Sequence, residues 1–507
     1  MFSSEQWLAN SGANFYNGIA TQSLRFDDGG SPKLTHTSSS HGNRKTFTIS
    51  FWMKRANISI DQMRILNSNF SNDGTFDLYF EDTDEIVFRS RSTNTNGATF
   101  EWARKSQRKF RDVSAWYHIA IAVDVTVSSP SSQLDLFTFY LNGENITSNF
   151  TNVTNPERSV GTSNVDLYWN STTEHEIGSS GYAGQYFDGY LAEFCNIDGL
   201  ALAPSNFGEE KFGVWIPIEP VVSDYGTNGF RLKFIGTGTA TSSGAVTNPT
   251  NIGDDSSGKN NHFAVSGLDP YDSNMPDSPE NNFATYNPLQ IAAPSSSFFL
   301  SEGNLALTAT NNSGYRNCSA TFSPMGFKGY IEFVASALNH KIGIIADTTH
   351  PTNQDYGNSG PQHVTLEYNG EVKFPNNGTS LRSASDHNLG TLATGDVMGM
   401  AFDFTGTNRN VWFHRANTYG TASGGLGNPA TGANPIVTAT QLNSTGPYRF
   451  HFGINNGPVL RINFGQDGTF GGTETAQGNT DGNGIGDFYY APPSGYLALC
   501  TANLPEP

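Results

Sequence analysis

The sequence is poor in charge, in cysteine and in long apolar runs, and each shortage excludes a class of protein. Only 15% of the 507 residues are charged, against about 25% in a typical globular protein. The three cysteines, Cys195, Cys318 and Cys500, are far apart, and no CxxC pair occurs. This pattern offers neither a disulfide framework nor a zinc knuckle, and it suits buried thiols in a protein made in a reducing cytoplasm.

The chain also lacks the signals that direct proteins into or across membranes. A helix needs a run of about 18 apolar residues to cross a bilayer, and the sequence has none. The N-terminal stretch MFSSEQWLANSG has no basic region followed by an apolar core, so we do not expect a signal peptide. The net charge of −18 repels nucleic acid and anionic membranes at long range. We therefore expect no nucleic-acid partner and no membrane insertion.

Turn formers and aromatic residues are abundant, with 54 Gly, 24 Pro, 36 Phe and 20 Tyr. Disordered chains lack the aromatics needed to build a core, so we expect a folded protein. Apolar residues alternate with polar ones in segments such as 46–53, 116–123 and 136–141. The last segment leads into Asn142-Gly143, a pair that tolerates the positive φ angles of a tight hairpin turn. These patterns predict an all-β protein.

The order of these segments predicts two antiparallel β-sandwiches. Alternating segments end near residue 200 and resume near residue 298, and Asn369-Gly370 marks another hairpin turn. The stretch between them is rich in Gly and Pro. We predict an N-terminal arm (1–20), a first sandwich (21–204), an extended but ordered connector (205–290) and a second sandwich (291–507). Aromatic residues scattered along the connector are expected to pin it onto its neighbours: Tyr225, Phe230, Phe234, Phe263, Tyr271 and Tyr286.

The first half resembles the jelly-roll laminin-G/concanavalin A-like lectin superfamily. The motifs that carry this resemblance are SLRFDD (23–28), TFTISFWMKR (46–55), AWYHIA (115–120), FYLNG (139–143) and FDGYLAE (187–193). Residues 188–193, 213–217 and 225–230 are more specific and resemble virion proteins of tailed bacteriophages. The second half is similar to the SPRY-like sandwich that follows in those proteins, with markers at 395–399, 462–466 and 492–500. Many members of that family continue past the LPEP motif (504–507), where this chain stops.

This resemblance implies a structural protein of the virion, made in the host cytoplasm. Related chains are described as tail fibres, head fibres or decoration proteins, which implies other virion proteins as partners and a homo-oligomer, with a trimer expected. The alternatives are a dedicated carbohydrate- or receptor-binding adhesin for a host-surface glycan and, third, a polysaccharide depolymerase. We expect no enzyme, because the E-x-D-x-x-E strand of the related glycosidases is missing. The acidic run 81–85 has the wrong spacing and is expected to form a turn.

One loop has spacing that suits Ca²⁺, the only cofactor that the sequence suggests. Asp481, Asn483 and Asp487 place oxygen ligands at close intervals among glycines. The alternative is a long Gly/Asn hairpin loop, and the same choice applies to the pairs Asp27-Asp28 and Asp254-Asp255. In residues 174–176 the histidine would oppose its two glutamates on a strand, which is poor metal geometry.

No glycan-binding residue can be assigned from the sequence. Exposed aromatic side chains stack on sugar rings in many lectins, and three aromatics lie in or near polar stretches: Trp102, Trp169 and Tyr182. Core packing is the alternative explanation for each of them.

Overall fold

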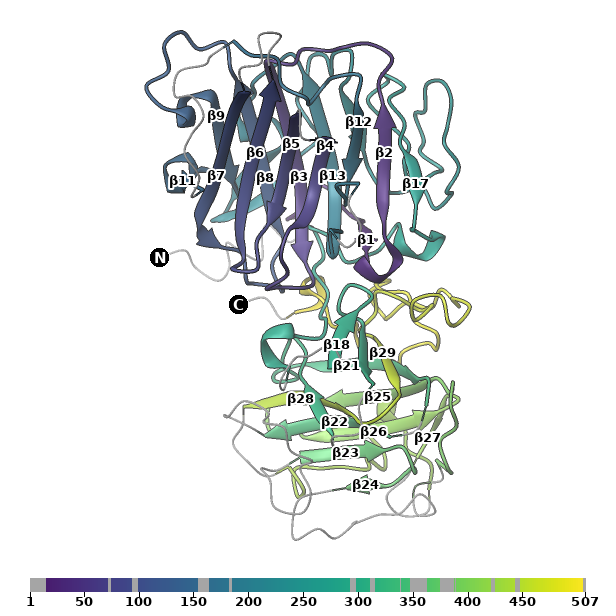
Figure 1. Ribbon diagram of the computed structural model, residues 1–507. Coiled ribbons are helices and arrows are strands. Elements are labelled where there is room, and N and C mark those ends of the chain that lie inside the picture. Colours follow the sequence, from purple (N-terminus) through teal and green to yellow (C-terminus); the bar gives the residue numbers. More distant parts are fainter. Residues whose placement is uncertain are drawn as a thin grey trace.

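A computed structural model shows two β-sandwiches stacked end to end (Figure 1). It describes residues 15–71, 74–93, 99–153, 164–181, 185–291, 298–310, 315–337, 339–346, 363–373, 387, 389–420, 425–442 and 447–504. In Figure 1 the strands of the first sandwich run along the length of the molecule, and those of the second run across it. The predicted all-β fold is confirmed.

The first sandwich consists of a seven-stranded and an eight-stranded antiparallel sheet. The seven-stranded sheet has the order β1-β13-β3-β8-β9-β10, and β16 also pairs with β13. Its strands are β1 (Leu24–Phe26), β3 (Thr46–Arg55), β8 (Tyr117–Asp124), β9 (Phe137–Leu141), β10 (Glu144–Asn145), β13 (Gly189–Asp198) and β16 (Phe230–Leu232). The eight-stranded sheet has the order β11-β7-β6-β5-β4-β12-β2-β17. Its strands are β2 (Lys33–Thr37), β4 (Met63–Ser71), β5 (Gly74–Phe80), β6 (Glu85–Thr93), β7 (Thr99–Lys109), β11 (Phe150–Asn152), β12 (Glu174–Ile177) and β17 (Ala264–Ser266).

The second sandwich consists of a seven-stranded and a five-stranded sheet. The orders are β18-β19-β29-β21-β25-β26-β27 and β20-β28-β22-β23-β24. The first of these contains β18 (Phe298–Ser301), β19 (Ala306–Ala309), β21 (Lys328–Ala335), β25 (Met398–Asp403), β26 (Asn410–Arg415), β27 (Thr418–Tyr419) and β29 (Val459–Asn463). The other contains β20 (Arg316–Cys318), β22 (His340–Ala346), β23 (His363–Glu367), β24 (Val372–Lys373) and β28 (Tyr448–Ile454).

The remaining elements are a small hairpin and short 3-10 turns. Strands β14 (Gly208–Lys211) and β15 (Val214–Pro217) form the hairpin. The turns are η1 (Asp28–Gly30), η2 (Gln133–Leu136), η3 (Thr147–Asn149), η4 (Pro204–Asn206), η5 (Pro270–Asp272), η6 (Pro288–Gln290), η7 (Pro429–Thr431) and η8 (Thr501–Asn503). No helix in the described ranges is long and apolar enough to cross a bilayer.

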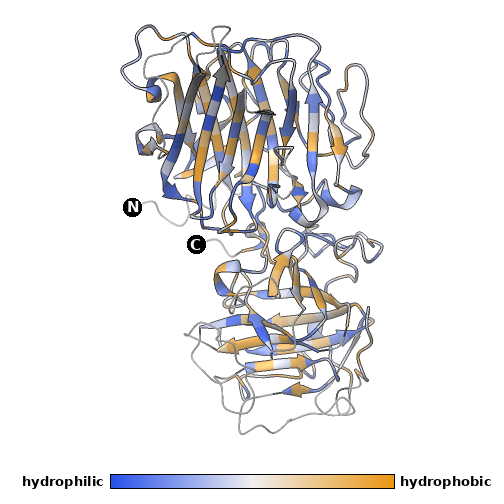
Figure 2. Ribbon diagram, viewed as in Figure 1, coloured by the Kyte–Doolittle hydropathy of each residue, from blue (hydrophilic) through white to orange (hydrophobic). Residues whose placement is uncertain are grey.

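Alternation of apolar and polar residues along the strands creates the two main cores, and Figure 2 shows this alternation on both sandwiches. In β3 the four apolar side chains predicted to share a face are fully buried in the first core: Phe47, Ile49, Phe51 and Met53. The opposite face of β3 is buried as well, because later segments cover it. There Trp52 packs on His118, which stacks on Trp215 of β15. The three cysteines are free and buried, as expected.

Much of the segment predicted as a connector belongs to the first sandwich. Two three-residue strands, β16 and β17, extend both of its sheets, and Phe230, Phe234 and Phe263 lie in its core. Farther along, Met275 and Tyr286 enter the second core. The aromatics therefore pin the segment to both neighbours, as the sequence suggested. The sequence did not predict β16 and β17, because a strand of three residues between turns is too short to show an alternation of apolar and polar residues.

Candidate functional site at the junction of the sandwiches

A buried ionic cluster at the junction is organised by Arg25. In β1, Leu24 and Phe26 point into the first core, so the intervening Arg25 points the other way, and its side chain is fully buried. Its Nη1 lies 2.8 Å from Asp467 Oδ2, and its Nη2 lies 2.9 Å from Asp272 Oδ1 and 3.3 Å from Glu302 Oε2. Asp467 and Glu302 belong to the second sandwich. One guanidinium therefore joins carboxylates from both domains.

A second buried ion pair joins β3 of the first sandwich to the segment that leads into the second. Lys54 Nζ lies 2.8 Å from Asp277 Oδ2, and both side chains are 1% exposed or less. Trp116 Nε1 donates to the other oxygen of Asp277 at 3.1 Å. Lys54 also donates to the carbonyl of Phe283 at 2.9 Å. A buried ion pair compensates the cost of removing its charges from water only when further hydrogen bonds satisfy its oxygens and protons. Here Trp116 satisfies one oxygen of Asp277, and the Phe283 carbonyl satisfies one proton of Lys54.

The tip of the β18–β19 hairpin docks onto the first sandwich. Three successive residues at this tip have left-handed backbone angles, with φ of 55° at Glu302, 62° at Gly303 and 65° at Asn304. Each of them also forms a hydrogen bond to the first domain. Glu302 N donates to Asp27 Oδ1 at 3.0 Å, the Gly303 carbonyl accepts from Tyr190 Oη at 2.8 Å, and Asn304 Nδ2 donates to the Ala56 carbonyl at 2.8 Å.

An acidic cluster lies where β1 ends and β13 begins. Asp27 and Asp28 follow β1, Asp188 precedes β13, and Phe26 pairs with Gly189 across the sheet. One ligand atom from each of the three carboxylates lies within 4.8 Å of the others, and no other such group of histidine, cysteine or acidic residues occurs in the described ranges. Asp188 is 1% exposed. Burial, and then the charges of Asp28 and Asp27, raise the pKa of Asp188 well above its usual range.

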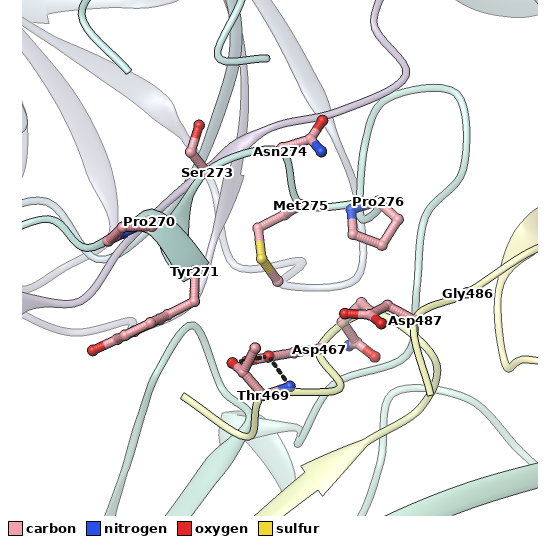
Figure 3. A pocket seen from close by; sticks show the side chains of 11 residues that line it. Pro270, Tyr271, Ser273, Asn274, Met275, Pro276, Asp467, Thr469, Gly486 and Asp487 are labelled. Carbon is pink, nitrogen blue, oxygen red and sulfur yellow. Dashed lines mark hydrogen bonds between the residues drawn. The ribbon is translucent and has the colours of Figure 1, made fainter. Parts of the chain in front are cut away.

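A pocket of about 350 Å³ opens at the same junction (Figure 3). It is lined by Pro270, Tyr271 and residues 273–276 of the segment between the sandwiches and by the loops of the second sandwich that contain Asp467 and Asp487. Tyr271 presents its ring there, and Asp467 Oδ1 accepts from both Thr469 N and Thr469 Oγ1. Burial raises the pKa of Asp487. The pocket thus offers an aromatic ring, carboxylates and amides, groups that can bind a small polar ligand.

The predicted calcium loop is tied together by its own hydrogen bonds. Asp481 Oδ1 accepts from the backbone N–H of Asn483 at 2.9 Å and of Ile485 at 3.0 Å. Its Oδ2 accepts from Ala498 N at 3.0 Å and from Asn503 Nδ2 at 2.7 Å. Asp487 lines the junction pocket. These contacts match the alternative, a hydrogen-bonded Gly/Asn loop, and calcium binding by Asp481, Asn483 and Asp487 stays a prediction.

The other candidates from the sequence have structural roles. In the acidic run 81–85, Asp84 takes a left-handed φ of 68° in the turn between β5 and β6, and it pairs with buried Arg55 at 3.1 Å. His175 of β12 is buried, and its Nε2 accepts from Asn170 N at 3.0 Å. Asp255 accepts from Arg231 N of β16 and from Ser257 N of its own loop.

Neither tryptophan proposed for sugar stacking is accessible. Trp102 is 1% exposed and packs edge-on against Phe137, and Trp169 is 0% exposed and donates to Asn196 Oδ1 at 2.9 Å. Tyr182 lies outside the described residues. Sequence reasoning overlooked Arg25 and Asp188. The signal for Arg25 was a charged residue in a strand between two core positions, whereas the partners of Asp188 come from a distant part of the chain.

Comparison with known proteins supports the lectin-like fold of the first half. Residues 28–196 match the family model described as the concanavalin A-like lectin/glucanases superfamily. No curated protein gave a significant match. The first sandwich is therefore a concanavalin A-like lectin/laminin-G domain.

Matches among solved structures include laminin and SPRY domains, at low identity and low TM-score. Mouse laminin alpha1 domains LG4-5 are 10% identical, with 88% of this chain and 89% of that chain covered and a TM-score of 0.28. The SPRY domain of human HERC1 is 12% identical, with 36% and 97% covered and a TM-score of 0.25. Domain 4 of the arabinanase AbnA from Geobacillus stearothermophilus, in complex with arabinotriose, is 16% identical, with 32% and 65% covered and a TM-score of 0.23.

Proposed function

We propose that this chain is a non-enzymatic structural protein of a tailed-phage virion that displays lectin-like domains for attachment to the host surface. The match of residues 28–196 to the concanavalin A-like lectin superfamily carries the lectin part of the proposal. The virion part rests on the segments 188–193, 213–217 and 225–230, which resemble virion proteins. A tail fibre, a head fibre and a decoration protein all fit this description.

The junction pocket is the place where we propose that a glycan binds. Its volume of about 350 Å³ is near the lower end of the range for small-molecule sites, which suits one or two sugar rings. Sugars present hydroxyl groups around an apolar ring face, and they therefore need hydrogen-bonding side chains beside an aromatic surface. Tyr271 is the aromatic residue of the lining, and Asn274 and Asp487 offer amide and carboxylate groups. In Figure 3 the Tyr271 ring extends away from these two residues.

A glycan array probed with the full chain tests the lectin proposal. We expect saturable binding to at least one surface polysaccharide and a loss of at least tenfold in affinity for Tyr271→Ala. Tyr140→Ala serves as the matched control, because Tyr140 is a partly exposed tyrosine of β9 that does not line the pocket. Unchanged affinity of Tyr271→Ala would show that the glycan does not bind in this pocket. Absence of binding to every glycan on the array would reject the lectin function.

Light scattering after gel filtration tests the oligomeric state that a fibre subunit requires. We propose a symmetric homo-oligomer, with a trimer as the expected state, because closed symmetry is the rule for such assemblies. A discrete species of three chains supports a fibre or spike. A monomer at every concentration contradicts the trimer and favours an adhesin or a decoration protein that is ordered only on the particle.

A further inference from the structure

We propose that the side chains of Lys54 and Asn282 join in an isopeptide bond, a covalent amide link between the first sandwich and the segment that leads into the second. The three groups that such a reaction needs meet here: an amine, a carboxamide and a carboxyl group that can move protons. Lys54 Nζ lies 2.7 Å from Asn282 Oδ1 and 2.8 Å from Asp277 Oδ2. The inference concerns how the domains are joined, and it does not depend on the proposed glycan or virion function.

The amide of Asn282 is held with its carbonyl towards the amine. Its Nδ2 donates to the Ser114 carbonyl, so Oδ1 is the atom that faces Lys54. Because a carbonyl bond is about 1.2 Å long, an oxygen at 2.7 Å places the carbon that Nζ must attack no more than about 4 Å away. The backbone of Asn282 is fixed as well, since its N donates to Thr501 Oγ1 at 3.0 Å and its carbonyl accepts from Thr501 N at 2.9 Å. Groups held this close react as one molecule, without the entropy cost of an encounter.

Burial favours the protonation states that the reaction needs. The side chain of Lys54 is 1% exposed and that of Asp277 is 0% exposed. Trp116 Nε1 donates to Asp277, and the centre of the Tyr190 ring lies 5.8 Å from Lys54 Nζ. Burial lowers the pKa of Lys54 and raises the pKa of Asp277. Transfer of one proton from the ammonium to the carboxylate replaces two buried charges by two neutral groups, and the neutral amine is the nucleophile.

The reaction needs no further reactant and no change of oxidation state. Asp277 takes one proton from Lys54, and the neutral Nζ adds to the carbonyl carbon of Asn282. The bond from that carbon to Nδ2 then breaks. Asp277 gives its proton to the departing nitrogen and takes the second proton of Nζ, which becomes the N–H of the new amide. One molecule of ammonia leaves, and Asp277 remains as a neutral carboxylic acid beside the bond.

An exposed pair in the same chain has the contact but not the surroundings. Lys45 Nζ lies 2.9 Å from Asn164 Oδ1, a distance close to that in the buried pair. Its side chain is 32% exposed, and the carboxylate beside it, Asp166, is 58% exposed and 3.7 Å away. Water stabilises the charged ammonium there, so this amine is not a nucleophile. The exposed pair is therefore an internal control that should stay unlinked.

The bond fixes the two sandwiches to each other. Lys54 is the second-last residue of β3 in the first sandwich. Asn282 is tied through its backbone to Thr501, and the next residue, Phe283, forms a β-bridge with Cys500 near the end of the second sandwich. The two linked residues are 228 positions apart in the sequence. A cross-link over so long a loop restricts the unfolded chain and so stabilises the folded one.

Peptide mapping by mass spectrometry, on the full chain denatured after several days in solution, tests the bond directly. Trypsin cuts after lysine and arginine, so the linked residues lie in the peptides 46–55 and 260–316. We expect these peptides to occur joined, with the sum of their masses less one molecule of ammonia. Ring closure at an Asn-Gly pair also releases ammonia, so the joined peptides and not the intact mass decide the question. Recovery of the two peptides only as separate species would overturn the proposal.

Three variants test the role of each group. Asp277→Asn keeps the shape of the side chain but cannot take up a proton, and we expect at least a tenfold loss of joined peptides. Lys54→Arg keeps the positive charge without the amine and should give none. Lys45→Arg, the matched change at the exposed pair, should leave the yield unchanged.

Two results from these variants would contradict the mechanism. An undiminished yield in Asp277→Asn would show that Asp277 does not move the protons. Joined peptides from Lys45 and Asn164 would show that burial is not required. If Asp277→Asn or Lys54→Arg does not fold, the peptide map of the wild type still decides whether the bond exists.

Discussion

Arg25 shows how one buried residue holds distant parts of the chain together. It is the middle residue of the three-residue strand β1, yet its carboxylate partners are 247, 277 and 442 positions away in the sequence. Alternation along β1 was sufficient to predict that Leu24 and Phe26 enter a core. It could not predict what faces Arg25, because those partners depend on the docking of two domains.

Removing this guanidinium should destabilise the protein strongly. Arg25→Met leaves three carboxylates buried without their common cation, and we expect a loss of about 3 to 5 kcal/mol in the free energy of unfolding. Arg25→Lys keeps the charge but cannot bridge three partners, so its loss should be smaller. Urea denaturation of both variants measures these losses. A loss below about 1 kcal/mol for Arg25→Met would contradict the central place of Arg25 in the junction.

Glu332 provides a pH-dependent test at a single residue. This buried glutamate of β21 accepts from Tyr489 N at 2.8 Å and Tyr490 N at 2.6 Å, and Tyr330 Oη and Asn463 Nδ2 complete its contacts. Burial raises its pKa to about 7. The folded protein therefore holds this proton more tightly than the unfolded chain, and its stability falls as the pH rises from about 4.5 to about 7.

Comparison with Glu332→Gln isolates this effect, because glutamine does not titrate. Between pH 5 and pH 8 the stability of the wild type should fall by about 2.5 kcal/mol relative to the variant. The variant itself should be less stable at both pH values, since its amide group cannot accept all of the donors around it. Chemical denaturation at the two pH values gives the difference. A constant difference would show that Glu332 ionises at its ordinary pH.

At the scale of elements, strands were predictable and their unusual features were not. The Asn142-Gly143 hairpin is confirmed, with φ of 48° and 81° at the two residues between β9 and β10. The bulge in β13 was not foreseen: the register shifts between Ala192 and Cys195, and Glu193 there takes a left-handed φ of 46°. Glu193 makes a 2.8 Å ion pair with Arg231 of β16, a strand that the sequence did not reveal.

The β18–β19 hairpin tip offers a prediction at this scale. A Cβ on Gly303 would lie 2.4 Å from Tyr190 Oη, whereas a Cβ on Gly326 would meet nothing within 4 Å, although φ is positive at both, 62° and 74°. Gly326→Ala should therefore lower the free energy of unfolding by only about 1 kcal/mol, which is the cost of placing alanine in the left-handed region. Gly303→Ala should lose at least about 2 kcal/mol more, because the tip must withdraw from the first sandwich.

Thermal and urea unfolding of the two glycine variants measure this difference. Both glycines lie in the second sandwich and both require left-handed backbone, so their comparison isolates the contact with Tyr190. Equal losses would show that the hairpin tip can move away from Tyr190 without consequence.

At the scale of the whole molecule, the sequence predicted two sandwiches but not how they meet. Alternation and turn residues depend on neighbours a few positions away, and they were sufficient for the longer alternating strands, the fold class and the burial of the cysteines. The junction depends on pairs such as Arg25–Asp467 and Asp27–Glu302, which join residues hundreds of positions apart. The acidic cluster and the pocket lie at this junction, so the candidate site was the least predictable part.

The buried histidines predict how the whole protein responds to acid. Burial lowers the pKa of five histidines to about 3 or about 4: His118, His175, His340, His414 and His451. They are neutral in the folded state, whereas the unfolded chain takes up their protons below about pH 6.5. The stability they contribute is complete above that pH and is lost as the pH falls towards 4.

At pH 4.5 each of these histidines should lower the free energy of unfolding by about 2 to 3 kcal/mol. The five losses together are comparable to the whole stability of a domain. We therefore expect the protein to unfold cooperatively between pH 6 and pH 4. Circular dichroism measures this transition. His118→Gln should shift the midpoint to lower pH, and the exposed His41→Gln should leave it unchanged. A protein that keeps its spectrum at pH 4 would contradict burial of the histidines as neutral groups.

We propose that this chain is a structural protein of a tailed virion, and immunoelectron microscopy of tailed particles tests that proposal. Antibodies against the isolated protein would be applied to tailed particles purified from the source that encodes the chain. We predict gold label at one defined place on the particle, the tail or the head surface, and removal of that label by an excess of the free protein. Unlabelled particles, with the protein recovered only from the cell fraction, would contradict the account.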